Sequence, residues 1–241
     1  MKKSLVSLCI GLTVLVSCNK IKSPEIYMIT GEIKNFEGEV YLSPVVDTLY
    51  YAGNFKQDTA TVVDGKIKFM LSSKFETPMP FILRTDNSMS SAFVLEPKNH
   101  KIIIDDINGR LKIVNENSIL NDQQKIISGR MKSSREALNS AMKNMYNSNF
   151  SNDSIQKLSA IAQGKFKEET LLIIAEFSKD YPKSYVSFWY IAMGQMYYGY
   201  DIALENAYEN LSGEIKKSDV AILFEQKMLM SKMSQTGSTF P

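Results

Sequence analysis

Residues that could carry catalytic or metal-binding chemistry are few in this chain of 241 residues. It holds two cysteines, Cys9 and Cys18, and one histidine, His100, which lies in the stretch EPKNHKIIIDD. A zinc or other transition-metal site uses several histidine or cysteine ligands, and a calcium site uses a loop of closely spaced oxygen ligands. The sequence around His100 has neither pattern. A Ser-His-acid triad would depend on His100, and no Gly-x-Ser-x-Gly turn accompanies it. We therefore expect no metal site, no cofactor and no catalytic residue, and we place His100 in an exposed hairpin turn.

The most suggestive stretch for binding is YVSFWYIAMGQMYYGY, which holds more aromatic side chains than one helix face can bury. The main interpretation is core packing together with contact to the preceding part of the chain. The alternative is a partner-binding surface formed by Tyr185, Trp189, Tyr197 and Tyr198, because tyrosine and tryptophan combine a large apolar body with a polar tip.

The N-terminus, MKKSLVSLCIGLTVLVSC, has the pattern of an export signal. Lys2 and Lys3 precede an apolar run from Leu5 to Val16. This run is shorter than the roughly 20 residues that a membrane-spanning helix needs, so we interpret residues 1–17 as a signal peptide. The sequence LVSC ending at Cys18 resembles the lipobox of bacterial lipoproteins. The resemblance implies that Cys18 carries diacylglycerol, becomes the first residue and is N-acylated, which gives stable anchoring because several acyl chains act together.

Two expectations follow from lipidation at Cys18. Cys9 leaves with the signal peptide and the Cys18 sulfur is bound to lipid, so no thiolate remains for thiol–disulfide exchange by this chain alone. The whole chain has 28 basic and 26 acidic residues, and removal of Lys2 and Lys3 leaves 26 of each. Zero net charge argues against nucleic acid as a partner. Residues 18–25 form a polar tether, and Asn19 in place of an aspartate favours the outer membrane, facing the periplasm, as the location.

Residues 26–117 have the composition of β-strands. Short runs such as YMITGEI, EVYLSPV and KIIIDD are rich in Val, Ile, Tyr, Phe and Thr and are separated by turn residues. In TATVVDGKIKFM, Asp64 and Gly65 suit a two-residue type I′ turn, in which both central residues need positive φ. Ile67 and Phe69 then alternate with lysines, which indicates one apolar and one solvated face. We predict an antiparallel β-sandwich or open barrel here.

Residues 118–236 change to helical periodicity, so the fold class is α+β, with the β domain followed by a C-terminal α-helical bundle. Four stripes with steps of three and four residues each define one helix face. They are Ile127, Met131, Leu138 and Met145; Ile155, Leu158, Ala162, Phe166, Ile173 and Phe177; Val186, Trp189, Tyr190, Met193 and Tyr197; and Val220, Leu223, Phe224 and Met228. Residues 151–153 supply N-cap candidates. Residues 180–182 end one helix and start the next, with Pro182 near a first-turn position.

The order and spacing of several motifs resemble one bacterial family. These motifs are TGEIKNFEGEVYLSP, DTATVVDGKIKF, FVLEPKNHKIIIDD, VNENSILNDQQ and FSKDYPKSYVSFWYIA. They resemble the domain of unknown function that precedes thioredoxin-like domains in secreted thiol–disulfide oxidoreductases of the TlpA and ResA type. The resemblance implies that residues 237–241 are the vestigial start of such a thioredoxin-like domain. The Cys-x-x-Cys centre of these enzymes does not occur, so no catalytic role is transferred to any residue.

Three functions compete at this point. The first is a non-catalytic, lipid-anchored binding or scaffold module of the cell envelope, with a protein or peptide as partner. The second is the N-terminal accessory portion of a split or truncated thiol–disulfide oxidoreductase. The third is a small-molecule-binding lipoprotein, which an apolar pocket between the two regions would favour.

Overall fold

The computed structural model describes residues 27–34, 36–45, 56–71, 75–107, 110–116 and 118–236. The predicted signal peptide, Cys18, the tether and residues 237–241 lie outside these ranges. Nine strands come first and seven helices follow within the described residues. The strands are β1 Met28–Ile33, β2 Gly38–Pro44, β3 Asp58–Val62, β4 Lys66–Met70, β5 Met79–Arg84, β6 Met89–Ser90, β7 Phe93–Leu95, β8 His100–Ile107 and β9 Arg110–Asn115. The helices are α1 Ile119–Arg130, α2 Lys132–Tyr146, α3 Asn152–Asp180, α4 Tyr185–Tyr198, α5 Ile202–Glu209, α6 Gly213–Lys216 and α7 Asp219–Thr236.

The strands form one nearly closed, barrel-like sheet, which confirms the predicted α+β class with an N-terminal β region and C-terminal helices. Their order is β3-β2-β5-β6-β9-β8-β1-β4, and β7 pairs with β5. Because β3 and β4 are joined by a tight hairpin, the two ends of this order come together. The sheet is not purely antiparallel as predicted, since β1 pairs with β8 and β6 with β9 in parallel. Such pairs need long crossover connections, which local sequence signals do not specify.

The β3–β4 hairpin has the predicted turn. Asp64 and Gly65 have φ of 50° and 70°, and the Val63 and Lys66 backbones exchange hydrogen bonds of 3.0 and 2.9 Å. Both central residues need positive φ in a type I′ turn, and glycine adopts it without strain. After the turn, Ile67 faces the core while the lysines of β4 face solvent, so the predicted alternation is confirmed.

Serine caps fix where α3 and α4 start. Ser151 accepts a hydrogen bond from the Ser154 N–H at 3.3 Å, as predicted, and Ser184 caps α4 through the Val186 N–H at 3.0 Å. Pro182 therefore lies in the turn before α4 and not in its first turn, which corrects the prediction. The caps satisfy N–H groups that have no partner inside the helix.

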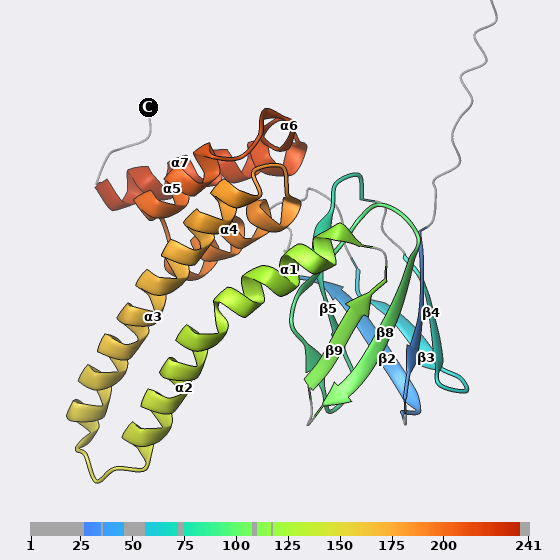
Figure 1. Ribbon diagram of the computed structural model, residues 1–241, viewed down its shortest axis with the longest axis horizontal. Coiled ribbons are helices and arrows are strands. Elements are labelled where there is room, and N and C mark those ends of the chain that lie inside the picture. Colours follow the sequence, from blue (N-terminus) through green and yellow to red (C-terminus); the bar gives the residue numbers. More distant parts are fainter. Residues whose placement is uncertain are drawn as a thin grey trace, which may run out of the picture.

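Figure 1 shows how the helices are arranged around the barrel. Helices α4 to α7 pack together beside the barrel, and α1 crosses from the barrel to the helices. α2 and the N-terminal half of α3 form a hairpin that projects away from both, while the C-terminal half of α3 packs against α4 and α5. A continuous apolar core runs from the barrel into the helices. Trp189 lies at their contact, where its indole N–H donates to the Pro78 carbonyl at 2.6 Å, so a buried polar group is paired across the junction.

Candidate binding groove

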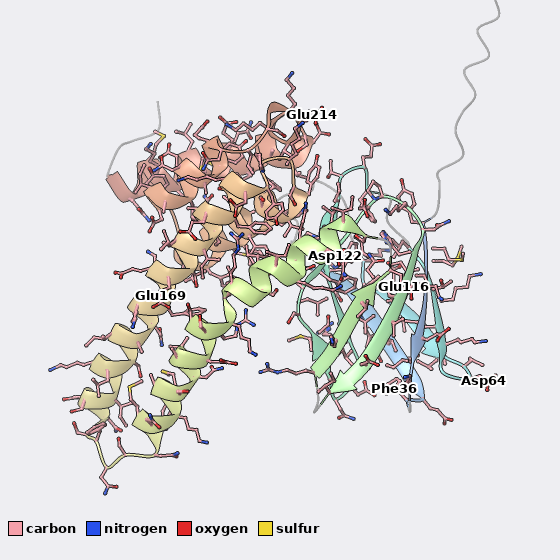
Figure 2. All side chains as sticks on the ribbon, viewed as in Figure 1. Phe36, Asp64, Glu116, Asp122, Glu169 and Glu214 are labelled. Atoms are coloured by element: carbon pink, nitrogen blue, oxygen red, sulfur yellow. The ribbon has the colours of Figure 1, made fainter. Side chains whose placement is uncertain are left out.

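The sheet is split where β9 passes β6 and β7. β6 pairs with β9 only at Met89 with Arg110 and Ser90 with Leu111, and the chain then turns into β7, which pairs with β5. Beyond Leu111, no strand of the described chain lies beside this edge of β9. α1 runs along the opening instead, and Figure 2 shows Asp122 on α1 near Glu116, which directly follows β9.

The backbone of Ile113 faces this opening. In an antiparallel pair, residues alternate between those that hydrogen-bond the partner strand and those whose N–H and C=O point away. The Glu116 N–H donates to the Lys101 carbonyl at 3.1 Å, so Glu116 is one of the residues that hydrogen-bond to β8. Because the pattern repeats every second residue, Val114 and Lys112 also hydrogen-bond to β8. Ile113 therefore directs its N–H and C=O away from β8, toward the split. The register of the sheet thus leaves an unpaired strand edge inside a concave site.

Two amide side chains of α1 take the place of a missing strand along the rest of the split. The Gln124 side-chain NH₂ donates to the Ala92 carbonyl, and its oxygen accepts from the Val94 N–H at 3.2 Å. The Asn121 oxygen receives a long hydrogen bond of 3.5 Å from the Asn115 N–H. Residues three apart share one helix face, so the spacing of Asn121 and Gln124 directs both amides at the barrel.

A groove of about 650 Å³ lies between these walls. It is lined by Ser91, Ala92, Phe93, Ile107, Arg110, Leu111, Lys112, Ile113, Val114, Asn121, Gln124, Lys125 and Ser128. Successive strand side chains point to opposite faces of a sheet, so a lining of consecutive β9 residues means that the groove follows the strand edge and not one face. Its volume lies within the range of about 300–1,000 Å³ typical of ligand sites.

A buried polar network fixes α1 against the barrel. His100 is 6% exposed, so its predicted place in an exposed turn is wrong. One ring nitrogen lies 2.9 Å from the Glu96 carbonyl oxygen, and the other lies 3.0 Å from the Asn115 amide nitrogen. The Ser118 hydroxyl donates to the Glu96 carboxylate at 3.2 Å and also caps α1 through the Asn121 N–H. Burial requires each of these polar groups to be paired, so together they fix the position of the groove wall.

The four aromatic residues predicted to bind a partner do not lie in the groove. Trp189 is fully buried and is a core residue, in agreement with the main interpretation of its stretch. Tyr185 is half-buried and packs edge-on against Phe188, with ring centroids 6.4 Å apart. Tyr197 is 71% exposed. Tyr198 is half-buried, and the Lys167 ammonium lies 5.9 Å from its ring centroid. A partner surface at these three tyrosines stays a prediction.

The same aromatic stretch nevertheless contributes to the wall behind the groove. The Tyr190 hydroxyl lies 3.4 Å from the Ser128 hydroxyl, and Ser128 lines the groove. Burial raises the pKa of the Tyr190 hydroxyl, and its hydrogen bond to Ser128 partly offsets that rise. Tyr190 therefore stays protonated at neutral pH and acts as a neutral hydrogen-bonding group.

Within the described ranges, no three His, Cys, Asp or Glu side chains cluster in a way that could hold a metal ion. None of the described helices combines the length and the apolarity needed to cross a bilayer.

Residues 27–124 match the model of a protein family described as a domain of unknown function (DUF4369). The matched span contains every strand of the barrel and ends on α1 at Gln124, so the strand edge and both amides of the groove wall lie within it. Comparisons with curated proteins and with solved structures found no match.

Proposed function

Taking the barrel as a domain of the DUF4369 family, we propose that the chain is a lipid-anchored, non-catalytic binding module of the cell envelope. Its groove between β9 and α1 binds an extended segment of a partner protein. The unpaired backbone of Ile113, inside a groove of about 650 Å³, is the observation that supports this function best. An exposed strand edge is a template for another strand, whose backbone hydrogen bonds supply affinity.

Proline at position 113 gives a selective test. Because the Ile113 N–H points away from β8, Ile113→Pro removes the groove-facing donor and no hydrogen bond of the β8–β9 ladder. Proline is tolerated in strands where the lost N–H faces an open edge. Ile113→Ala is the matched control, since it shortens the side chain and keeps the N–H. Val114→Pro, which breaks a ladder bond, should unfold the barrel.

Binding is measured with the purified full chain and a fluorescent short peptide of alternating valine and threonine. We expect the peptide to bind wild type and Ile113→Ala and to lose about fivefold or more in affinity with Ile113→Pro, which corresponds to one strand hydrogen bond of about 1 kcal/mol. A peptide N-methylated along one edge should also lose binding, while methylation of the other edge should be tolerated. Equal binding of both methylated peptides would contradict strand addition and would favour a small ligand as the occupant.

The anchoring half of the proposal rests on Cys18 and the export pattern before it. We propose that the protein is held at the outer membrane and faces the periplasm. Mass spectrometry of the native protein should find diacylglycerol and an N-acyl chain on Cys18, and Cys18→Ala should move the protein from the membrane fraction to the soluble fraction. An unmodified thiol at Cys18 would contradict lipid anchoring.

A second candidate, motivated by the sequence resemblance, is an accessory portion of a thiol–disulfide oxidoreductase. The groove would then hold an unfolded substrate near a redox partner. Adding the chain to a thioredoxin-like protein of the same envelope should speed reduction of an unfolded disulfide substrate, and Ile113→Pro should remove the increase. An unchanged rate would eliminate this candidate and leave the binding module.

A further inference from the structure

We propose that the groove selects an acidic strand in which carboxylates alternate with aliphatic side chains. This inference rests on the proposed function, because it specifies the chemistry of the extended segment that the groove binds. Two independent observations carry it, the sign of the charges around the groove and the alternation of side chains along β9.

Every charged side chain that the structure describes in the groove lining is basic. Arg110 and Lys112 come from β9 and Lys125 comes from α1, and all three are exposed. Lys125 is partly neutralised by Asp122, which lies 3.0 Å from its ammonium group. Asp105 lies opposite Lys112 in the β8–β9 register but is not part of the lining. The balance around the groove is therefore positive, although the full chain has nearly equal numbers of acidic and basic residues.

The β9 side chains also prescribe an alternating pattern. Leu111 is buried and Ile113 is half-buried on the inward face, whereas Arg110 and Lys112 are exposed on the outward face. A strand added at this edge places its own side chains on the same two faces, and neighbours on one face of a sheet interact directly. Its outward residues therefore lie beside Lys112, while Arg110, whose neighbour at this edge is Met89 of β6, lies at the end of the groove. Its inward residues lie beside Ile113 and the buried ring of Phe93.

Carboxylates are the partner that these positions favour. Opposite charges on neighbouring strands attract, whereas like charges repel, so lysine in the outward positions of the added strand is disfavoured. The inward positions favour valine, isoleucine or leucine, because these side chains extend an apolar surface.

The experiment compares three fluorescent peptides of equal length, in which valine alternates with glutamate, threonine or lysine. Fluorescence anisotropy with the purified full chain should give about tenfold tighter binding for the glutamate peptide than for the threonine peptide, and the weakest binding for the lysine peptide. Raising the salt from 0.1 M to 1 M shortens the screening length from about 10 Å to about 3 Å and should reduce the preference sharply.

Charge reversal tests the named residues. Arg110→Glu combined with Lys112→Glu should reverse the order, so that the lysine peptide binds best. Lys157→Glu is the control, because Lys157 is exposed on α3 and does not line the groove. It should leave the order unchanged. If the double variant does not fold, the peptide series and its salt dependence still decide the matter.

The outcomes separate the two proposals. Binding of all three peptides with equal affinity would overturn acidic selection while leaving strand binding in place. No binding of any peptide would overturn both. A glutamate preference that survives charge reversal at Arg110 and Lys112 would also overturn the assignment, because the selecting charges would then lie elsewhere.

Discussion

Replacing Gln124 with alanine should loosen the junction between α1 and the barrel. The side-chain amide of Gln124 bonds the Ala92 carbonyl and the Val94 N–H, so it occupies the position that a neighbouring strand would hold. These residues are 32 and 30 positions away from Gln124 in sequence, and the bonds therefore tie α1 to the sheet and not to its own helix.

The expected loss follows from the burial of the two partners. Val94 is buried, so its N–H would stay unsatisfied, which costs about 1–3 kcal/mol. Ala92 is half-buried and its carbonyl can bind water, so that loss is nearer the net value of one hydrogen bond, about 0.5–1.5 kcal/mol. The free energy of unfolding should therefore fall by about 2–4 kcal/mol in Gln124→Ala.

Gln156→Ala is the matched control, because it makes the same chemical change at an exposed position of α3. Glutamine and alanine differ little in helix propensity, and that small difference cancels between the two variants. Urea unfolding can be followed by the fluorescence of Trp189, the single tryptophan, which lies at the contact between barrel and helices. Its signal reports the separation of these two parts.

The reasoning would be refuted by a Gln124→Ala variant whose stability lies within about 0.5 kcal/mol of Gln156→Ala, the scatter expected for surface substitutions. The slope of unfolding free energy against urea should stay constant, since a changed slope means a changed denatured state or loss of two-state behaviour. The same variant should also weaken peptide binding, because the groove loses the residue that fixes its wall.

Three further predictions concern the fold. Burial, helped by nearby carboxylates, raises the pKa of Tyr208 to about 12, so the folded chain holds that proton more tightly than the unfolded chain. The stability that this pKa difference contributes is complete below pH 10 and is lost toward pH 12. In urea titrations over that window, the free energy of unfolding of wild type should fall by about 2–3 kcal/mol relative to that of Tyr208→Phe. Gly65→Ala should lower the free energy of unfolding by about 1–2 kcal/mol, because φ is +70° and the new Cβ would lie 3.1 Å from the Ile33 carbonyl oxygen. Gly164→Ala on α3, where the new Cβ meets open space, should raise it by up to about 1 kcal/mol. Thermal melts that rank these two variants the other way would contradict the turn assignment. Trp189→Phe should lower the free energy of unfolding by about 2–4 kcal/mol, because it removes the hydrogen bond to the Pro78 carbonyl and opens a cavity. Urea unfolding followed by circular dichroism measures this loss. A loss below about 1 kcal/mol would mean that the junction does not depend on this hydrogen bond.

Local signals explain which parts of the fold the sequence predicted. The Asp64-Gly65 turn and the Ser151 cap depend on residues at most three positions apart, so their geometry is written in the neighbouring residues. The change from β-strand to helical periodicity near Ser118 agrees with β9 ending at Asn115 and α1 starting at Ile119. The aromatic stretch was also interpretable, since Trp189 is the core residue that its apolar surroundings indicated.

The groove between β9 and α1 was invisible in the sequence because its parts come from distant segments. Asn121 and Gln124 look like ordinary polar positions of an amphipathic helix, and nothing near them identifies Ala92 or Asn115 as their partners. His100 looked like a turn residue for the same reason, because Asn115, which pairs with its ring, lies 15 residues further along the chain.

Sequence alone determined the order of strands before helices, the tight hairpin and the Ser151 cap of α3, because each depends on periodicity or on contacts within a few residues. Tertiary structure decided the parallel pairing of β1 with β8, the short β6 ladder that leaves Ile113 unpaired, and the position of α1 across the gap. These features depend on which distant strands become neighbours, and that choice is made by burial of the whole core and not by any one segment.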